Sequence, residues 1–161
     1  MALSRLSDVL WRERHLLELL LFKLEEEQLI LTSGRSQWLT HATREVETVL
    51  EQIREAELGR SAEAEAVAEL LGLDVGSSLL TISEHAPSPW DELLRAHRDA
   101  FVQLTTQISQ VADGNRELLA MSHRATQETL LSLQDTVQTY DVRGSSSTPV
   151  DRSAQLLDQS F

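Results

Sequence analysis

Leucines recur near the start of the chain at alternating intervals of three and four residues. The series runs Leu3, Leu6, Leu10, Leu17, Leu20, Leu24 and Leu31. Glu13 and Glu27 occupy the two steps at which a leucine is missing. Such spacing lines up one apolar stripe along a helix, which is typical of a helix packed lengthwise on a partner. We therefore expect a helix over residues 3–32 within an all-α fold.

A second stripe of the same kind follows the turn sequence TSGRS. Gly34 can end the first helix in a left-handed conformation, and Ser36 can cap the next helix. The second stripe consists of Leu39, Ala42, Val46, Val49, Ile53 and Ala56. We expect one helix over residues 36–71 that stops at Gly72, with Gly59 as the point where it could kink or break.

Two start signals precede the last stripe. The stretch SSLLTISEHA predicts a short connector helix over residues 78–86, capped by one of its two serines. In SPWDELL, Ser88 suits the N-cap, Pro89 the first helical position, and Asp91 the third, from which a carboxylate can reach back to the cap. The third stripe then runs through Leu94, His97, Phe101, Leu104, Ile108 and Val111.

The stretch QVADGNRELL decides how long the third helix is. Asp113-Gly114 followed by Asn115 is a common turn sequence. The stripe nevertheless continues in step to Asn115 and Leu118, whereas a corner would need extra residues or would reset the spacing. We therefore expect one helix over residues 89–140, since a glycine inside a helix costs only about 1 kcal/mol relative to alanine.

These elements predict an elongated antiparallel helical bundle or coiled coil, with three long helices and a short connector helix. The helical domain would span residues 1–143, and residues 144–161, rich in serine with Gly144 and Pro149, would form a flexible tail. At 1.5 Å per residue the long helices measure roughly 45, 50–55 and 75–80 Å. Helices so unequal cannot cover one another, so we expect an uncovered apolar stripe on the last one. Its members are Leu118, Leu119, Met121, Leu130, Leu131, Leu133, Val137 and Tyr140.

Composition argues against several function classes. The formal net charge is −12 and Lys23 is the only lysine, whereas nucleic-acid binding needs a basic surface. No cysteine is present, which excludes disulfides and fits a reducing compartment. The apolar run LLELLLFKL is interrupted by charges and is shorter than the about 20 residues of a membrane span. We expect a cytoplasmic protein with no nucleic-acid partner and no membrane insertion.

No catalytic or metal-binding pattern stands out. The Glu-x-x-His pair of di-iron bundles is missing, as are the common hydrolase, phosphate-loop and dinucleotide motifs. His97 falls on the third stripe and is interpreted as a core or edge histidine. The run Glu25–Glu27 is interpreted as a solvated helix face, because hard cations need oxygen ligands that converge from several elements. We expect no cofactor, no bound metal and no enzymatic activity.

The order of these features resembles that of the flagellar export chaperone FlgN family, over roughly residues 3–144. The resemblance includes an opening helix of the type LSDVLWRERHLLELLLFKLEEEQLILTSG and a second helix that begins SQWLTHATREVETVL. A Gly72-Leu73 stop and APSPWDELLRAHRDAF follow, and then NRELLAMS and a closing TYDVRG. The pattern Asn115-x-x-Leu118-Leu119, with Tyr140 near the end of the last helix, is most similar to the family.

The resemblance implies a cytoplasmic helical chaperone of type III flagellar export without catalytic activity. Its partners would be the hook-filament junction proteins, the hook-associated proteins FlgK and FlgL, whose disordered amphipathic C-terminal segments it would bind. Binding would prevent premature assembly, and the chaperone would deliver them to the export-gate protein FlhA. A segment that folds on its partner loses ordering entropy on binding, which leaves the affinity moderate enough for release.

The resemblance also implies site residues on the last helix. The substrate-binding candidates are Leu118, Leu119, Leu130, Leu133 and Val137, with ordinary core packing as the alternative, strongest for the first two. Tyr140 is the candidate contact for FlhA, although an amphipathic ring at a helix end explains it equally well. Asn115 matches the family's asparagine, and we interpret it as a residue that sets helix register.

Two further hypotheses concern self-contact. The chain could instead be a structural coiled-coil or scaffold protein that forms homo-oligomers through the same apolar seam. Separately, Leu156, Leu157 and Phe161 make an isolated apolar cluster in the tail, which could fold back onto the uncovered stripe and compete with substrate. A chain that ends at Gly144 should then bind substrate more tightly.

Overall fold

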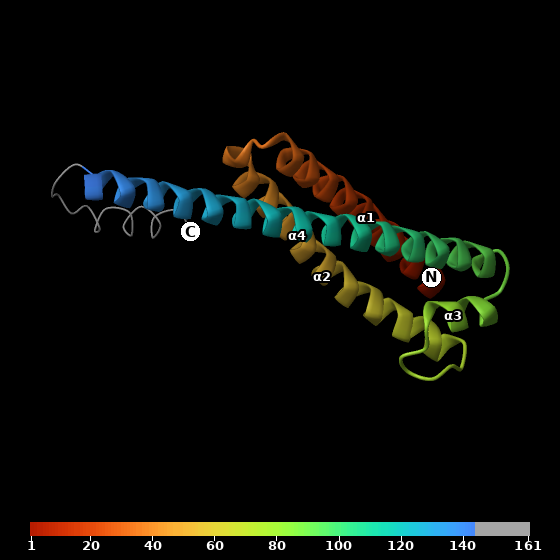
Figure 1. Cartoon of the computed structure of the whole chain (residues 1–161). Coiled ribbons are helices and arrows are strands. Elements are labelled where there is room, and N and C mark those ends of the chain that lie inside the picture. The colour runs from red at the N-terminus through yellow and green to blue at the C-terminus, as the bar shows by residue number, and fades with distance from the viewer. Residues whose placement is uncertain (144–161) are drawn as a thin grey trace. The chain divides into compact units, whose positions relative to one another are not determined.

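The computed structural model describes residues 1–143, with side chains as far as Thr139. These residues form helices and no strand, which confirms the predicted all-α helical bundle. The helices are α1 (Ala2–Ser33), the 3₁₀ helix η1 (Ser36–Trp38), α2 (Leu39–Leu70), α3 (Leu79–His85) and α4 (Trp90–Arg143) (Figure 1). The tail predicted over residues 144–161, with Leu156, Leu157 and Phe161, lies outside the described residues.

The chain divides into two compact units, Met1–Leu119 and Ala120–Phe161. The first unit holds α1, η1, α2, α3 and the first part of α4, and the second holds the rest of α4. Within residues 1–143, no helix combines the length and the apolar character that crossing a membrane requires.

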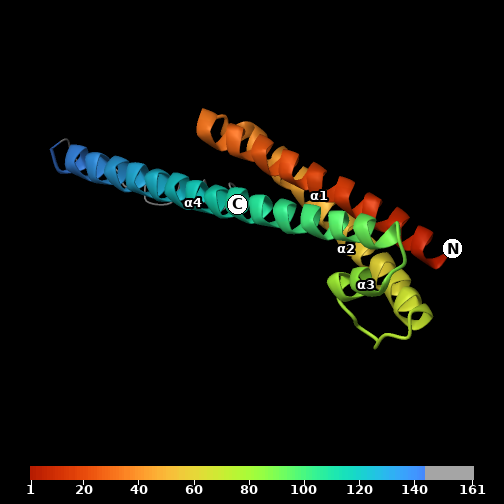
Figure 2. The same ribbon diagram turned by 90° about the vertical axis from the view of Figure 1, so that its right-hand side faces the viewer.

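In the first unit, α1 and α2 lie side by side and run in opposite directions (Figures 1 and 2). Two exposed ion pairs between α1 and α2 show that the helices are antiparallel. Lys23 Nζ lies 2.9 Å from a carboxylate oxygen of Glu45, and Arg5 Nε lies 3.0 Å from one of Glu63. As residue numbers fall along α1 they rise along α2, which is the sign of antiparallel helices. Exposed pairs add only about 0–1 kcal/mol each, so apolar burial between the helices must supply most of the stability.

The apolar stripes predicted for α1 and α2 form two buried clusters. The cluster near the middle of the helices contains Leu17, Leu20, Leu24, Val46, Val49 and Ile53. The cluster toward the α3 end contains Leu6, Leu10, Val67, Ile82 and Leu94. Full burial of one such side chain contributes about 1.5–3 kcal/mol, so these residues explain why two long helices stay paired.

The first part of α4 packs on this hairpin and runs parallel to α1. His97 contacts Trp11 near the start of α1, and Asn115 bonds to Glu27 near its end. Between these two contacts, half-buried apolar side chains of α4 pack against the middle cluster: Phe101, Leu104, Ile108, Val111 and Ala112. The stripe predicted from the spacing is therefore the face by which this part of α4 is held.

Several helix ends follow the sequence signals. Gly34 and Gly72 have φ values of 73° and 70°, the left-handed conformation that glycine adopts easily. Ser78 caps α3, because its Oγ accepts from the backbone N–H of Thr81 at 3.1 Å. Helix α2 is continuous through Gly59. The capping role predicted for Ser36 was wrong, because Ser36 begins η1, and the N-caps of η1 and α2 make no side-chain capping bond.

The start of α4 also differs from the prediction. The helix begins at Trp90, and the carboxylate oxygen Oδ1 of Asp91 is buried without a hydrogen-bond partner, so the predicted capping box with Ser88 is wrong. Backbone carbonyls close this turn instead: Pro87 accepts from Trp90 N–H at 2.9 Å, and Pro89 from Leu93 N–H at 3.3 Å. Farther along, α4 passes through Asp113-Gly114 without a break, as the continuous stripe predicts.

Candidate functional site

Asn115 is the polar residue in the α4 stripe, and it is only 2% exposed. Its Nδ2 donates to the main-chain carbonyl of Leu24 at 2.9 Å and to Oε1 of Glu27 at 3.1 Å. The second Glu27 oxygen accepts from Oγ1 of Thr43 on α2 at 3.3 Å. Because a shift of any helix would leave buried polar groups unpaired, this junction favours a single alignment of the three helices. That is a physical basis for the register role predicted for Asn115.

Glu27 departs from its predicted surroundings. The run Glu25–Glu27 was interpreted as a solvated helix face, but Glu27 is only 6% exposed. Glu25 is exposed and Glu26 half-buried, so the interpretation was wrong for the third member alone. The cause is helical geometry, since Glu27 stands in the leucine stripe and therefore faces α2 and α4, where Asn115 and Thr43 donate to it.

Of the predicted substrate residues, Leu118 and Leu119 belong to the first unit. Both are half-buried and lie in the helical turn of α4 that follows Asn115. Their position beside the buried junction agrees with the packing role that was the alternative for these two residues. Half-buried side chains still present part of their surface to a partner, so the two interpretations are compatible.

The other substrate candidates belong to the second unit. Leu130 is half-buried, whereas Leu133 is 57% and Val137 49% exposed. The three are separated by three and four residues and therefore share one face of α4. We call Leu130, Leu133 and Val137 the apolar face.

The three charged residues within residues 120–139 lie on the opposite side of the helix. Arg124, Glu128 and Asp135 are separated by four and seven residues, so they share a face. At 100° per residue this charged face points away from the apolar face by about half a turn. A partner could therefore cover the apolar face without removing these charges from water. Leu131, which is 61% exposed, falls beside the charged face and not on the apolar face.

Threonines make this part of α4 a weak helix by itself. Each of four donates its hydroxyl to the carbonyl four residues earlier, at 2.8–3.0 Å: Thr126, Thr129, Thr136 and Thr139. Threonine has low helix propensity, and such bonds destabilise a helix slightly. Helical stability in proteins comes mainly from the packing of an apolar face, so a partner on this face would stabilise the segment.

Tyr140, the predicted contact for the export gate, lies within α4. Its side chain is outside what the structure describes. Its position three residues after Val137 places it near the same helix face, by spacing alone.

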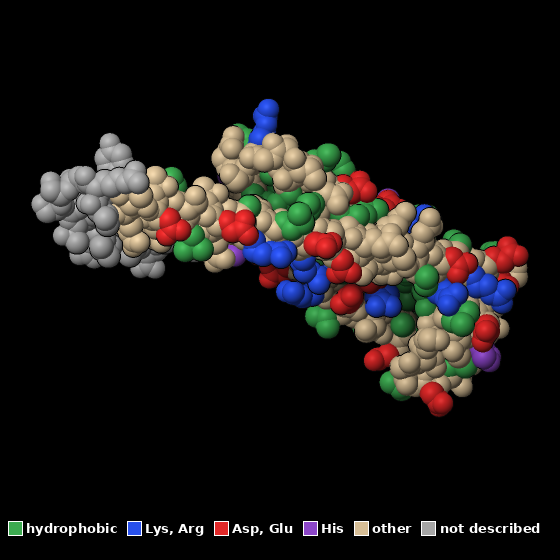
Figure 3. Space-filling model, viewed as in Figure 1, with side chains coloured by type: hydrophobic (Ala, Val, Ile, Leu, Met, Phe, Trp, Pro, Cys, Tyr) green, Lys and Arg blue, Asp and Glu red, His purple; other side chains and the backbone are tan. Residues whose placement is uncertain are grey.

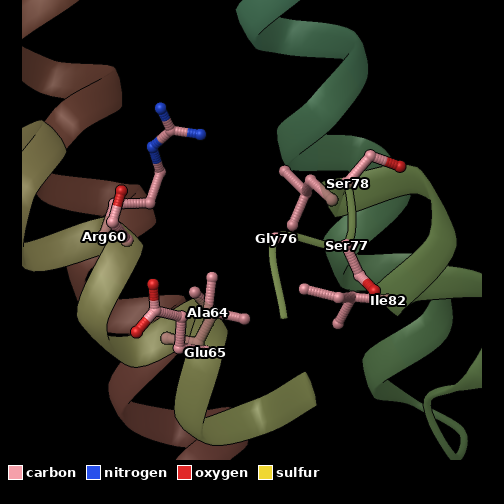
Figure 4. Close-up of a pocket in the computed structure, with 10 residues that line it drawn as sticks. Arg60, Ala64, Glu65, Gly76, Ser77, Ser78 and Ile82 are labelled. Carbon is pink, nitrogen blue, oxygen red and sulfur yellow. The ribbon is translucent and has the colours of Figure 1, made fainter. Parts of the chain in front are cut away.

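A small pocket lies between α2 and the loop before α3. Figure 4 shows Arg60, Ala64 and Glu65 on one wall, opposite Gly76–Ser78 and Ile82. Its serines serve the local backbone, since Ser77 Oγ donates to the carbonyl of Asp74 at 2.6 Å and Ser78 caps α3. Ser77 and Ser78 thus have structural roles in the loop before α3.

Glu13 is a second buried carboxyl group of the first unit. Arg60 Nε lies 2.7 Å from Oε2 of Glu13, which fills a leucine position of the stripe. Burial raises the pKa of Glu13, and the nearby Arg60 partly opposes that effect.

His97 is only 1% exposed, and neither ring nitrogen has a hydrogen-bond partner among the described residues. Its ring meets that of Trp11 edge-on, with centroids 4.7 Å apart. Burial lowers the pKa of His97, and the positive charge of Arg14 lowers it further. A buried neutral imidazole among aromatic rings is a core residue, which agrees with the interpretation of His97 from the sequence.

Metal binding finds no support in residues 1–143, where no three histidine, aspartate or glutamate side chains gather as a metal ion would require. Figure 3 shows acidic and basic side chains interspersed over the visible face of the first unit.

Sequence reasoning missed the partners of Asn115. Glu27 and Thr43 complete its junction, and both lie far from it along the chain. One signal was available, because Glu27 and Asn115 are both polar residues at stripe positions, and buried polar groups require partners. Thr43 carried no such signal.

A family model described as FlgN protein matches residues 1–148. Comparisons with curated proteins and with solved structures give no match.

Proposed function

The chain belongs to the FlgN family of flagellar export chaperones, and from this premise we propose which partners it binds and where. Its substrates are hook-associated proteins of the FlgK and FlgL type. It binds their disordered, amphipathic C-terminal segments in the cytoplasm, prevents premature assembly and delivers them to the export-gate protein FlhA.

The exposed apolar face carries this proposal. Leu133 and Val137 expose about half of their surface. Arg124, Glu128 and Asp135 lie on the opposite side of the helix by their spacing. An amphipathic helix from another chain matches such a face, because it too has one apolar side to bury. Burial of the exposed half of each side chain would contribute about half of the 1.5–3 kcal/mol that full burial gives, or roughly 1 kcal/mol each.

The same arrangement suits temporary binding. The substrate segment loses conformational entropy when it folds on the chaperone, and this cost offsets part of the apolar gain. The threonine-rich helix contributes little stability of its own, so the complex depends on the apolar contact. Affinity that rests on one narrow face can remain moderate, as release at the export gate requires.

Tyr140 is the proposed contact with FlhA. Its place near the end of α4 matches the aromatic residue of the family, and aromatic rings are frequent anchors in protein interfaces. A Tyr140→Ala chain that still binds substrate but no longer binds FlhA would support this assignment. Equal loss of both activities would contradict it, since that result indicates a shared or structural role.

The substrate site is tested with two leucines that differ only in the face they occupy. Leu133→Asp places a charge on the apolar face, whereas Leu131→Asp places the same charge beside the charged face, at similar exposure. Binding of the C-terminal segment of a hook-associated protein is measured by calorimetry. We expect Leu133→Asp to weaken binding about 10- to 100-fold, the equivalent of one lost leucine contact, and Leu131→Asp to change it by less than about threefold.

Equal effects of the two substitutions would contradict the assignment of the face. Helix content of both variants, from circular dichroism, is the control for folding, because aspartate has the same helix propensity at either position. Leu130→Asp combined with Leu133→Asp should abolish binding. If that pair left binding intact, the apolar face would not be the substrate site.

Self-association through the same face is the competing function. A persistent large oligomer, measured by light scattering, with no binding of hook-associated segments would favour a scaffold. A chain whose mass rises by that of one segment when the segment is added would favour the chaperone.

A further inference from the structure

A second set of apolar side chains runs along α1, on the side opposite the leucine stripe. Its members expose between 39% and 70% of their surface: Trp11, Leu19, Phe22 and Leu29. At 100° per residue they share one side of the helix, about half a turn away from Leu17, Leu20 and Leu24 of the middle cluster. We call these four residues the outer face of α1. Exposed apolar residues that share one side of a helix mark an interaction surface.

The charges beside the outer face differ between its two halves. Arg12 and Arg14 lie beside the half near the start of α1, and Glu25 and Glu26 lie beside the other half. Helical spacing puts Arg14 and Glu25 on one flank of the face, and Arg12 and Glu26 on the other flank. The outer face therefore has a basic end and an acidic end, with apolar side chains between them.

Such a face is complementary to a second copy of itself when the two helices run in opposite directions. Suppose that Trp11 of one copy lies level with Leu29 of the other. Arg14 then lies within about 2 Å, measured along the helix, of Glu25 in the second copy. Two-fold symmetry repeats this pair, and Arg12 meets Glu26 on the other flank in the same way. In a parallel pair, each charge would instead meet its own kind.

Ion pairs within α1 compete only weakly with this arrangement. Arg14 lies 3.3 Å from Glu18, and Lys23 lies 3.5 Å from Glu26, with all four side chains partly exposed. Exposed ion pairs contribute little to stability, so apolar contact would hold the two copies together and the charges would select the direction. Phe22 lies near the middle of the face, and the two Phe22 residues would be about 6 Å apart along the helix axis.

We propose that the outer face of α1 is an interface between two copies of this chain, which pair antiparallel about a two-fold axis near Leu20. The interface uses no residue of the apolar face of α4, so this inference goes beyond the proposed function and does not depend on it. An interface of this symmetry closes after two copies. The face is about 27 Å long, and small interfaces are transient, so we expect a dissociation constant in the micromolar range.

Self-association is tested by analytical ultracentrifugation of the full chain over about a hundredfold range of concentration. The mean mass should rise from that of one copy toward that of two. Leu29→Asp should weaken the dimer about tenfold or more. Leu58→Asp is the matched control, because Leu58 lies on α2 and is 75% exposed, compared with 70% for Leu29. It should leave the dimer unchanged, and circular dichroism checks that both variants are folded.

The charges are tested by exchange between two variants. Arg12→Glu with Arg14→Glu makes both ends of the face acidic, and Glu25→Arg with Glu26→Arg makes both ends basic. Neither variant should dimerise by itself, because like charges would then meet at each end. An equal mixture of the two should form a dimer at least as stable as that of the parent chain. A mixture that stays monomeric would contradict the proposed contacts.

The direction of pairing is tested with one nitroxide label for each chain. The sequence contains no cysteine, and the exposed Ser4 lies on the same side of α1 as the outer face. Pulsed electron paramagnetic resonance of the Ser4→Cys dimer should give a label separation of about 50 Å. A parallel pair would give roughly 10 Å, the usual distance between packed helices.

Four results would overturn the proposal. The first is a parent chain that stays monomeric over the whole concentration range, and the second is the short label distance. The third is equal weakening by Leu29→Asp and Leu58→Asp, which would show a general effect of added charge. The fourth is a dimer that Leu133→Asp removes and Leu29→Asp preserves, which would assign self-association to α4. Binding of a hook-associated segment should be unchanged by Leu29→Asp, so this proposal and the proposed function can fail separately.

Discussion

Asn115 and Glu27 illustrate how single polar residues act inside an apolar stripe. Each stands where the leucine spacing predicts an apolar side chain, and each is buried. A buried carboxylate without a cation needs donors, and Asn115 and Thr43 supply them from two other helices. These polar residues take the place of apolar contacts in the core. They therefore specify which helices pack together and in which axial register.

Removal of the Asn115 side chain should destabilise the first unit. Asn115→Ala leaves Oε1 of Glu27 buried without this donor, and a lost bond to a buried charged group costs about 1–3 kcal/mol. Urea unfolding measures the loss, with the exposed Arg116→Ala as control. Asn115→Leu combined with Glu27→Leu should recover most of it, since both polar groups are then gone. If the double variant were as unstable as Asn115→Ala, the junction would not explain the effect.

His97 should make stability depend on pH. Its pKa is lowered in the folded chain by burial and by Arg14, so the unfolded chain binds the proton more tightly. Stability should therefore fall as pH drops from 7.5 through the ordinary value of 6.5 to 5.5. Thermal unfolding of His97→Leu over this range should show a flatter pH dependence. A slope equal to that of the parent chain would assign the effect to another group.

Glu13 acts with the opposite sign. Its pKa is raised by burial, so the folded chain binds the proton more tightly than the unfolded one. Its contribution to stability is therefore fully present below the ordinary value of 4.5 and is lost as pH rises through the raised pKa. The slopes of His97 and Glu13 oppose each other wherever their ranges overlap, which is why the single substitution at His97 is the informative comparison.

At the scale of elements, a glycine can lie inside a helix or follow its end, and its effect on stability differs between the two positions. Gly59 lies inside α2 with open space around it, whereas Gly72 has a φ of +70° beyond the end of the same helix. One residue type thus costs stability at the first position and supplies a required conformation at the second.

Alanine should therefore have opposite effects at the two glycines. Gly59→Ala should stabilise the chain by about 0.5–1 kcal/mol, because alanine is the better helix former and its Cβ meets nothing. Gly72→Ala should destabilise it by about 1 kcal/mol, since the left-handed conformation is strained for alanine. Both are measured by urea unfolding. Stabilisation by both changes would contradict the positive φ at Gly72.

At the scale of the whole molecule, the two units differ in what stabilises them. The first unit has two apolar clusters and a buried polar junction. In the second unit, no side chain of residues 120–139 is buried, and only that of Leu130 is half-buried. Stability within one protein is uneven for such reasons.

Hydrogen exchange should reveal this difference. Amides buried in the first unit should exchange slowly with or without substrate, and those of residues 120–139 should exchange faster in the free chain. Addition of the C-terminal segment of a hook-associated protein should slow exchange in residues 126–139 above all. Protection confined to the first unit would contradict the proposed site, and Leu133→Asp should remove the protection while Leu131→Asp preserves it.

Much of the fold was predictable because its signals are local. The leucine spacing predicted α1, and its continuation through Asn115 predicted an unbroken α4. The capping roles predicted for Ser36 and Asp91 were wrong, because a cap depends on the backbone path into the helix. Here η1 precedes α2, and the Pro87 carbonyl accepts from the first N–H group of α4. Of the candidate site, the apolar face was predictable from spacing, whereas the burial of Glu27 depends on partners from distant segments.

The sequence by itself determined the helices and the side of each that is apolar, since periodicity of 3.6 residues is a property of neighbouring residues. Only the tertiary structure decided that α4 runs parallel to α1 and that Asn115 meets Glu27 and Thr43. Those contacts join residues far apart along the chain. Their energy depends on burial and on hydrogen-bond geometry, which exist only once the three helices are packed.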